Sequence, residues 1–189
     1  MLKANIIKNI FKLSSFLLIL FQLSCVQYKK RENIIVASAG KIESLDPAQA
    51  NTLRTLQILS ALGDTLYKIN KEGNLSPNLA SGLPKSSRNR LIIDIPLKEN
   101  ISFHDGSVFN AAAMKFSLDR FMKIGTLNYL LNDKIEAIEV KDEFLLRIKL
   151  KRPSSSLKSL LTSVNLTPIS PNSYSNYKDK FNNKSFIGT

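Results

Sequence analysis

Three places in this 189-residue sequence carry residue types that could do chemistry. Cys25 is the only cysteine and directly follows an apolar run, His104-Asp105 places the only histidine beside a carboxylate, and Asp119-Arg120 sets opposite charges side by side. A thiolate can be acylated or act as a nucleophile, and a histidine beside an acid can move protons near neutral pH. Each place also has an ordinary structural explanation, which has to be weighed first.

His104-Asp105 is better explained by a turn than by catalysis. Gly106 follows, and glycine supplies the positive φ that many turns need. The sequence has no glycine-rich phosphate loop, and one histidine with one cysteine cannot close a structural zinc site without carboxylates. We therefore expect no enzyme activity, no catalytic residue, no metal site and no cofactor, and we expect Asp119 and Arg120 to form a local ion pair.

Cys25 stands at the end of a three-part pattern that is typical of an export signal. Residues 1–24 contain three lysines without an acid and an apolar core from Leu13 to Leu23, which is shorter than the about 20 residues that span a bilayer. Ser24-Cys25 then resembles the lipobox of bacterial lipoproteins, in which the cysteine is acylated, although Gln22 stands where that motif usually has an aliphatic residue. The alternative is an ordinary signal peptide in which Cys25 is incidental.

The net charge of +12 is spread unevenly along the chain. Residues 1–24 contribute +3 and residues 25–143 contribute +2, whereas residues 144–189 hold eight basic residues against Asp179 alone. Arginines do not cluster, and aromatic side chains do not alternate with basic ones as they do on surfaces that stack on bases. We expect a solvated basic face and no nucleic-acid partner.

The elements that would position these residues alternate between strands and helices, which indicates an α/β (mixed) chain. Apolar spacing predicts a helix over Leu53–Leu66 and another after an Asn110 cap, from Ala111 to Phe121. Strict alternation in 144–150 after 135–140 predicts a hairpin with one buried face. Further predictions are strands at 34–38, 91–95 and 101–103 and a short helix capped by Ser156.

Five short stretches, which we call the landmarks, follow one another along the chain: Leu45-Asp46-Pro47, Asp64-Thr65-Leu66-Tyr67, Gly73 to Ala80, Ile101 to Gly106, and Phe116-Ser117-Leu118-Asp119-Arg120. Their order resembles that in the extracellular solute-binding proteins of family 5, which include oligopeptide-, dipeptide- and nickel-binding components of ABC importers. The resemblance covers about Ile34 to Thr189, and the chain departs from it by having no tryptophan.

The resemblance implies a periplasmic-binding-protein-like type II fold and a division of the chain. Residues 1–24 would be the signal peptide and 25–33 a lipid-anchored tether; 34–64 would open lobe one, 65–180 would form its inserted small domain, and 181–189 would start the return to lobe one. Because family members are much longer, we expect a chain truncated there, without the second lobe. In the family, charged groups of that lobe meet the ends of a peptide, so the ligand-binding residues are unknown.

The function implied by the resemblance is that of a substrate-binding lipoprotein of an ABC importer. It would be exported to the periplasmic space, anchored to the membrane through Cys25, and would deliver a peptide or similar small solute to the permease subunits as a monomer. Two alternatives stay open: a truncated or split remnant without transport activity, and a small basic surface protein that interacts through residues 144–189.

Overall fold

The structure is a computed structural model that describes residues 44–176 and 188–189. All of these residues belong to one compact unit, Lys41–Thr189. The signal peptide, the tether with Cys25 and the strand predicted at 34–38 lie outside the described residues, and the domain boundaries expected at 64 and 180 remain predictions. Within the described part of the chain, no helix is long and apolar enough to cross a membrane.

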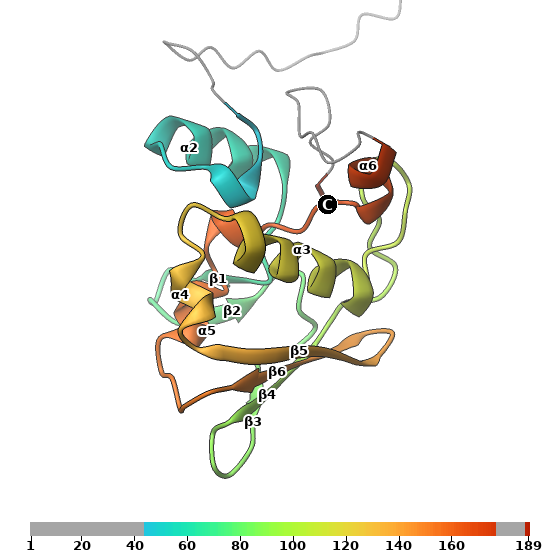
Figure 1. The fold of residues 1–189 in the computed structure, drawn as a ribbon. Coiled ribbons are helices and arrows are strands. Elements are labelled where there is room, and N and C mark those ends of the chain that lie inside the picture. Colours follow the sequence, from blue (N-terminus) through green and yellow to red (C-terminus); the bar gives the residue numbers. More distant parts are fainter. Residues whose placement is uncertain (1–43, 177–187) are drawn as a thin grey trace, which may run out of the picture. The chain divides into compact units, whose positions relative to one another are not determined.

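A four-stranded antiparallel sheet and one long helix form the centre of this unit (Figure 1). The strand order is β3 (Lys85–Ser86), β4 (Ile92–Pro96), β6 (Leu145–Leu150) and β5 (Ile135–Asp142). Helix α3 (Ala111–Ile124) lies across one face of the sheet. The alternating burial along β4 and β6 follows from this arrangement, because every second side chain points into the hydrophobic core.

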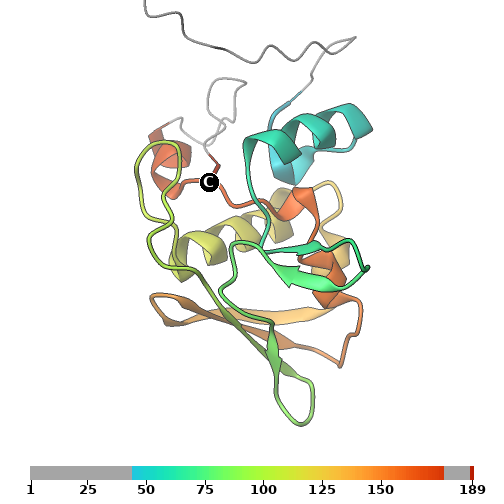
Figure 2. The same cartoon turned by 180° about the vertical axis from the view of Figure 1, so that it is seen from behind.

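Shorter elements surround this centre. A separate hairpin is formed by β1 (Tyr67–Ile69) and β2 (Leu75–Pro77), which Figure 2 brings to the front of the view. The remaining elements are η1 (Pro47–Gln49), α2 (Leu53–Leu62), α4 (Tyr129–Asn132), α5 (Leu157–Leu160), η2 (Val164–Leu166) and α6 (Pro171–Asn176). Contacts of η1 with η2, and of α3 with η1, η2 and α6, bring segments far apart in the sequence together.

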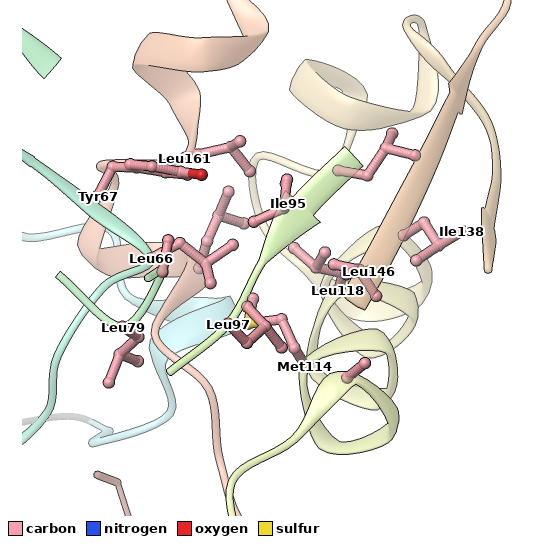
Figure 3. Close-up of a cluster of buried hydrophobic side chains, with 14 of the residues drawn as sticks. Leu66, Tyr67, Leu79, Ile95, Leu97, Met114, Leu118, Ile138, Leu146 and Leu161 are labelled. Carbon is pink, nitrogen blue, oxygen red and sulfur yellow. The ribbon is translucent and has the colours of Figure 1, made fainter. Parts of the chain in front are cut away.

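One hydrophobic core lies between the sheet, α3 and the β1–β2 hairpin (Figure 3). Met114 and Leu118 of α3 and Leu146 of β6 are completely buried in it. Tyr67 is also fully buried, and its hydroxyl donates a hydrogen bond to the Gly82 carbonyl oxygen over 3.0 Å. Burial raises the pKa of this phenol well above its usual range.

Two predicted elements are confirmed with their local causes. Helix α3 begins after Asn110, whose Oδ1 accepts the Ala113 N–H over 3.0 Å and so satisfies one of the unpaired donors at the helix start. The hairpin of β5 and β6 has the predicted face, because Leu146, Ile148 and Leu150 are buried. Its reversal lies at residues 143–144, slightly later than the predicted turn.

Three predictions of local structure are wrong. The helix predicted to Leu66 ends at Leu62, and the next residues enter the β1–β2 hairpin, which the sequence analysis missed. Residues 101–103 form no strand, since only an isolated bridge joins Ser102 to Val108 around the turn. Ser156 makes no capping hydrogen bond, because its backbone is already helical, with φ −73°.

Candidate functional site

The first and last landmarks meet in a buried ion pair. Asp46 precedes η1 and Arg120 lies on α3, where Nη1 is 2.8 Å from Oδ1 and Nη2 is 2.5 Å from Oδ2 of the carboxylate. The side chains are 1% and 8% exposed, respectively. Burial disfavours the charged guanidinium, but the two hydrogen bonds that it donates to the Asp46 carboxylate outweigh this effect and raise the pKa of Arg120. Such a pair fixes two segments relative to each other.

This geometry corrects the prediction of an ion pair between Asp119 and Arg120. Asp119 instead accepts from Lys115 Nζ over 2.6 Å, one helical turn earlier, and both of these side chains are largely exposed. Neighbouring positions on a helix point in directions about 100° apart, so adjacent opposite charges seldom meet, whereas residues i and i+4 do.

Arg120 also joins helix α6 to this arrangement. Its guanidinium carbon lies 4.8 Å from the centre of the Tyr174 ring, which is within the range of a cation–π contact. The same ring meets Phe116 edge to face at 5.5 Å between centroids. A hollow of about 570 Å³ opens beside these residues, and Gln49 and Lys123 also line it.

The His-Asp-Gly landmark forms a second contact between segments that are distant in the sequence. We call such contacts, including the Asp46–Arg120 pair, ties. The Asp105 carboxylate accepts hydrogen bonds from the backbone and hydroxyl of Ser107 and from the hydroxyls of Ser170 and Ser173, at 2.5 to 2.9 Å. Burial alone would raise the pKa of Asp105, but these hydrogen bonds stabilise the charged form and lower it to about 2. The carboxylate thereby holds the start of α6 against the turn.

His104 has a structural place in this turn. Its backbone N–H donates to the Gly188 carbonyl oxygen over 2.9 Å, and its side chain is exposed. Gly106 has φ +80°, the left-handed conformation that favours glycine, and its N–H closes the turn onto Phe103. The predicted turn is therefore confirmed, and the Asp105 carboxylate accepts hydrogen bonds from Ser107, Ser170 and Ser173.

Two buried polar residues that the sequence analysis missed complete the ties. Asn165 donates from Nδ2 to the carbonyl oxygens of Pro47 and Ala50 over 2.9 and 2.7 Å. The Ser117 hydroxyl accepts the Ile169 N–H over 3.1 Å and donates to the Ala113 carbonyl oxygen. Ser117 lies within a landmark, whereas no sequence signal distinguishes Asn165 from other asparagines.

Together these contacts hold three separate segments around α3: residues 46–50, the turn at 103–107 and residues 165–173. The arrangement fixes these backbone segments relative to one another. Among the described residues, no group of three or more histidine, cysteine, aspartate or glutamate side chains could hold a metal ion. Cys25, the predicted acylation site, lies outside the described residues.

Comparison with protein families gives a match over most of this unit. The model described as "Bacterial extracellular solute-binding proteins, family 5 Middle" matches residues 74–189. The glutathione-binding protein GsiB of Escherichia coli O6:K15:H31 (strain 536 / UPEC) is 31% identical over 148 residues, and GsiB of Pectobacterium atrosepticum is 30% identical. In both cases the match covers 77% of this chain and only 29% of the relative's length.

Comparison with solved structures confirms the predicted fold class. The pheromone receptor PrgZ superposes with a TM-score of 0.73 at 22% identity, over 80% of this chain and 34% of PrgZ. Listeria monocytogenes OppA bound to peptide gives 0.73 at 20% identity, over 80% and 33%. An ABC transporter substrate-binding protein from Sinorhizobium meliloti gives 0.66 at 28% identity, over 77% and 29%. The described chain thus has the mixed α/β fold of type II periplasmic binding proteins.

Proposed function

The chain belongs to the bacterial extracellular solute-binding proteins of family 5, and we propose that it serves as the substrate-binding component of an ABC importer. In this proposal a peptide or similar small solute is captured outside the cytoplasmic membrane and delivered to the permease subunits. The observation that carries the proposal is the family match over residues 74–189, together with the ties that hold the landmarks on α3.

Those ties suit a protein that works by closing around its ligand. Hinge closure moves rigid bodies about a few residues, so each body has to keep its shape while the hinge bends. The buried Asp46–Arg120 pair and the Asp105 cluster join distant segments to α3 and the sheet, which favours such a rigid body. In this account His104 and Asp105 act in the scaffold of a binding protein, and no reaction is assigned to them.

The first ligand to test is glutathione, because relatives with 30–31% identity carry the name glutathione-binding protein. Urea unfolding of the chain would be followed with glutathione and, separately, with a mixture of short peptides. A ligand present at 100 times its dissociation constant adds about 2.7 kcal/mol to the free energy of unfolding. Free amino acids of the same composition are the control, and an unchanged unfolding curve with every peptide would contradict the proposal.

We also propose that Cys25 carries the membrane anchor. Two acyl chains bury many methylene groups, each contributing about 0.8 kcal/mol, and the basic residues Lys29-Lys30-Arg31 would lie beside the anionic membrane surface. Mass spectrometry of the mature protein from membranes should find an N-terminal Cys25 with added acyl mass. A Cys25→Ser variant should be released into the soluble fraction, and an unmodified N-terminus in the wild type would refute the anchor.

A further inference from the structure

A polar hollow of about 490 Å³ lies at one end of the four-stranded sheet. Ser86 and Arg90 line it from β3 and the loop that leads to β4, Ser154 and Ser155 line it from the connection between β6 and α5, and Lys158 lines it from α5. Figure 1 shows the β3–β4 loop extending from the sheet beside that connection. None of these residues takes part in the ties around α3.

The lining has a chemistry that selects anions. Two cations, Arg90 and Lys158, and three serines line the hollow together with Ile93 and Pro153, and no carboxylate of the described residues lines it. Arg88 in the β3–β4 loop and Arg152 in the β6–α5 connection add exposed positive charge close by in the sequence. A concave surface with charge of one sign concentrates the field inside it and raises the local concentration of the opposite ion.

The acid nearest to this loop in the sequence does not neutralise the hollow. Asp94 of β4 already accepts two hydrogen bonds of 2.7 Å from Arg147 on the neighbouring strand. The hydrogen bonds from Arg147 hold the pKa of Asp94 below its usual range, so this carboxylate stays charged and paired. Among the residues that the structure describes, neither Arg90 nor Lys158 forms a salt bridge.

The loop also holds Arg90 in an unusual backbone conformation. Its φ is +58°, in the left-handed region that residues other than glycine rarely adopt. Four hydrogen bonds fix the loop: Arg90 N–H to Ser87 O, Ser87 N–H to Ile92 O, Leu91 N–H to Asn89 Oδ1, and Ile92 N–H to Ser87 Oγ. Strained conformations persist where the surroundings enforce them, and they are concentrated at ligand sites. The backbone at Arg90 is therefore held in place, and its exposed side chain extends from a fixed point of the loop.

We propose that this hollow binds a phosphoryl group, taken either from a free phosphate or from a phospholipid headgroup. A guanidinium can donate two parallel hydrogen bonds to phosphate oxygens, a lysine adds a point charge, and serine hydroxyls donate to the remaining oxygen atoms. Arg90, Lys158 and the serines Ser154 and Ser155 supply this set from two segments that the fold brings together. The site is separate from the solute binding proposed above and does not depend on it.

Calorimetric titration of the full chain in a nonionic detergent at low ionic strength tests the proposal. Inorganic phosphate and glycerol 3-phosphate, which represents a headgroup without acyl chains, are titrated separately. We expect saturable binding of at least one of these two compounds. Tighter binding of glycerol 3-phosphate assigns the site to lipid headgroups, whereas equal or tighter binding of inorganic phosphate assigns it to the free ion. Absence of saturable binding of both would overturn the proposal.

Two pairs of substitutions distinguish binding at this hollow from a general effect of the positive charge of the protein. Arg90→Gln with Lys158→Gln should weaken the binding at least tenfold, because both cations of the lining are lost. Lys68→Gln with Lys71→Gln removes the same charge from exposed positions at the β1–β2 hairpin and should change the dissociation constant less than twofold. Equal weakening by the two pairs would overturn the proposal. Ser154→Ala with Ser155→Ala keeps the charge and should weaken binding by a smaller factor.

Discussion

Two aspartate–arginine pairs in this molecule are both joined by two hydrogen bonds and differ in their surroundings. Asp46 and Arg120 form two hydrogen bonds of 2.8 and 2.5 Å, and Asp94 and Arg147 form two of 2.7 Å. The first pair is 1% and 8% exposed, the second 25% and 26%. A buried charge that loses its partner cannot be solvated, whereas an exposed one can, so similar distances should give very different contributions to stability.

The two pairs also differ in what else joins the segments that they connect. Asp94 and Arg147 are register partners on β4 and β6, which are held together by backbone hydrogen bonds in any case. Asp46 and Arg120 are 74 positions apart, and Asp46 belongs to the segment that leads into η1. Its Oδ1 also accepts the Ala48 N–H over 3.0 Å. Loss of the buried pair should therefore loosen residues 46–50, and loss of the exposed pair should leave the sheet intact.

The largest expected effect is that of Arg120→Met. The substitution keeps an apolar stem and leaves the Asp46 carboxylate buried without its partner, so the free energy of unfolding should fall by about 3–5 kcal/mol in urea titrations. Arg147→Met is the matched control and should cause a clearly smaller loss. Similar losses for the two variants would show that burial does not distinguish the pairs.

A smaller loss of free energy of unfolding is expected for Ser117→Ala, which compares a buried hydrogen bond between neutral groups with the buried ion pair. The variant leaves the Ile169 N–H without its acceptor, and an unsatisfied buried donor costs about 1–3 kcal/mol. Ser60→Ala on α2 is the control, because that hydroxyl bonds the Gln57 carbonyl oxygen at an exposed position. Urea unfolding should show a loss at Ser117 and almost none at Ser60; the reverse order would contradict the assignment.

Asp105→Asn tests the hydrogen bonds that the charged Asp105 carboxylate accepts at the surface, and its effect on the free energy of unfolding should depend on pH. The folded pKa of about 2 lies below the unfolded value of about 3.9, so the charged form stabilises the fold above pH 4, and this contribution is lost as the pH falls toward 2. At pH 7 the variant should lose about 1 kcal/mol, because water competes for hydrogen bonds at an exposed carboxylate. Unfolding measured from pH 7 to pH 2 should show the wild type and the variant converging, and a constant difference would be contrary to this account.

The smallest effect is expected for Asp94→Asn. Asp94 is a quarter exposed, so its pair with Arg147 should contribute less than about 1 kcal/mol, and added salt should reduce that further. Urea unfolding at low and high ionic strength measures both. A loss as large as that of Arg120→Met, or one unaffected by salt, would remove the distinction between the pairs.

The parts of the fold that the sequence predicts are those with long, regular patterns. Helix α3 has apolar spacing over 14 residues and a capping asparagine, and β6 alternates strictly against β5. Strands β1 and β2 have three residues each, which is too short for a period of two to be recognised. The stretch at 101–103 has two apolar residues around Ser102, which predicts a strand, but the turn at Gly106 leaves room for a single bridge only.

The sequence pointed to some residues of the candidate site, but not to Asn165, Ser170 or Ser173, and it predicted none of the pairings. The landmarks contain Asp46, Asp105, Ser117 and Arg120, which all make the ties described above. Their partners come from distant segments, and spacing along the chain gives no tertiary distances. Sequence adjacency even suggested the wrong partner for Arg120, because it ignores the direction of side chains around a helix.

A double-mutant cycle on Asp46 and Arg120, run in parallel with one on Asp94 and Arg147, tests the central claim that burial makes the first pair a tie between distant segments. Single and double alanine variants would be compared by urea unfolding. We predict a coupling free energy above about 2 kcal/mol between Asp46 and Arg120 and a clearly smaller coupling between Asp94 and Arg147. A coupling at Asp46–Arg120 no larger than that at the exposed pair would contradict the account.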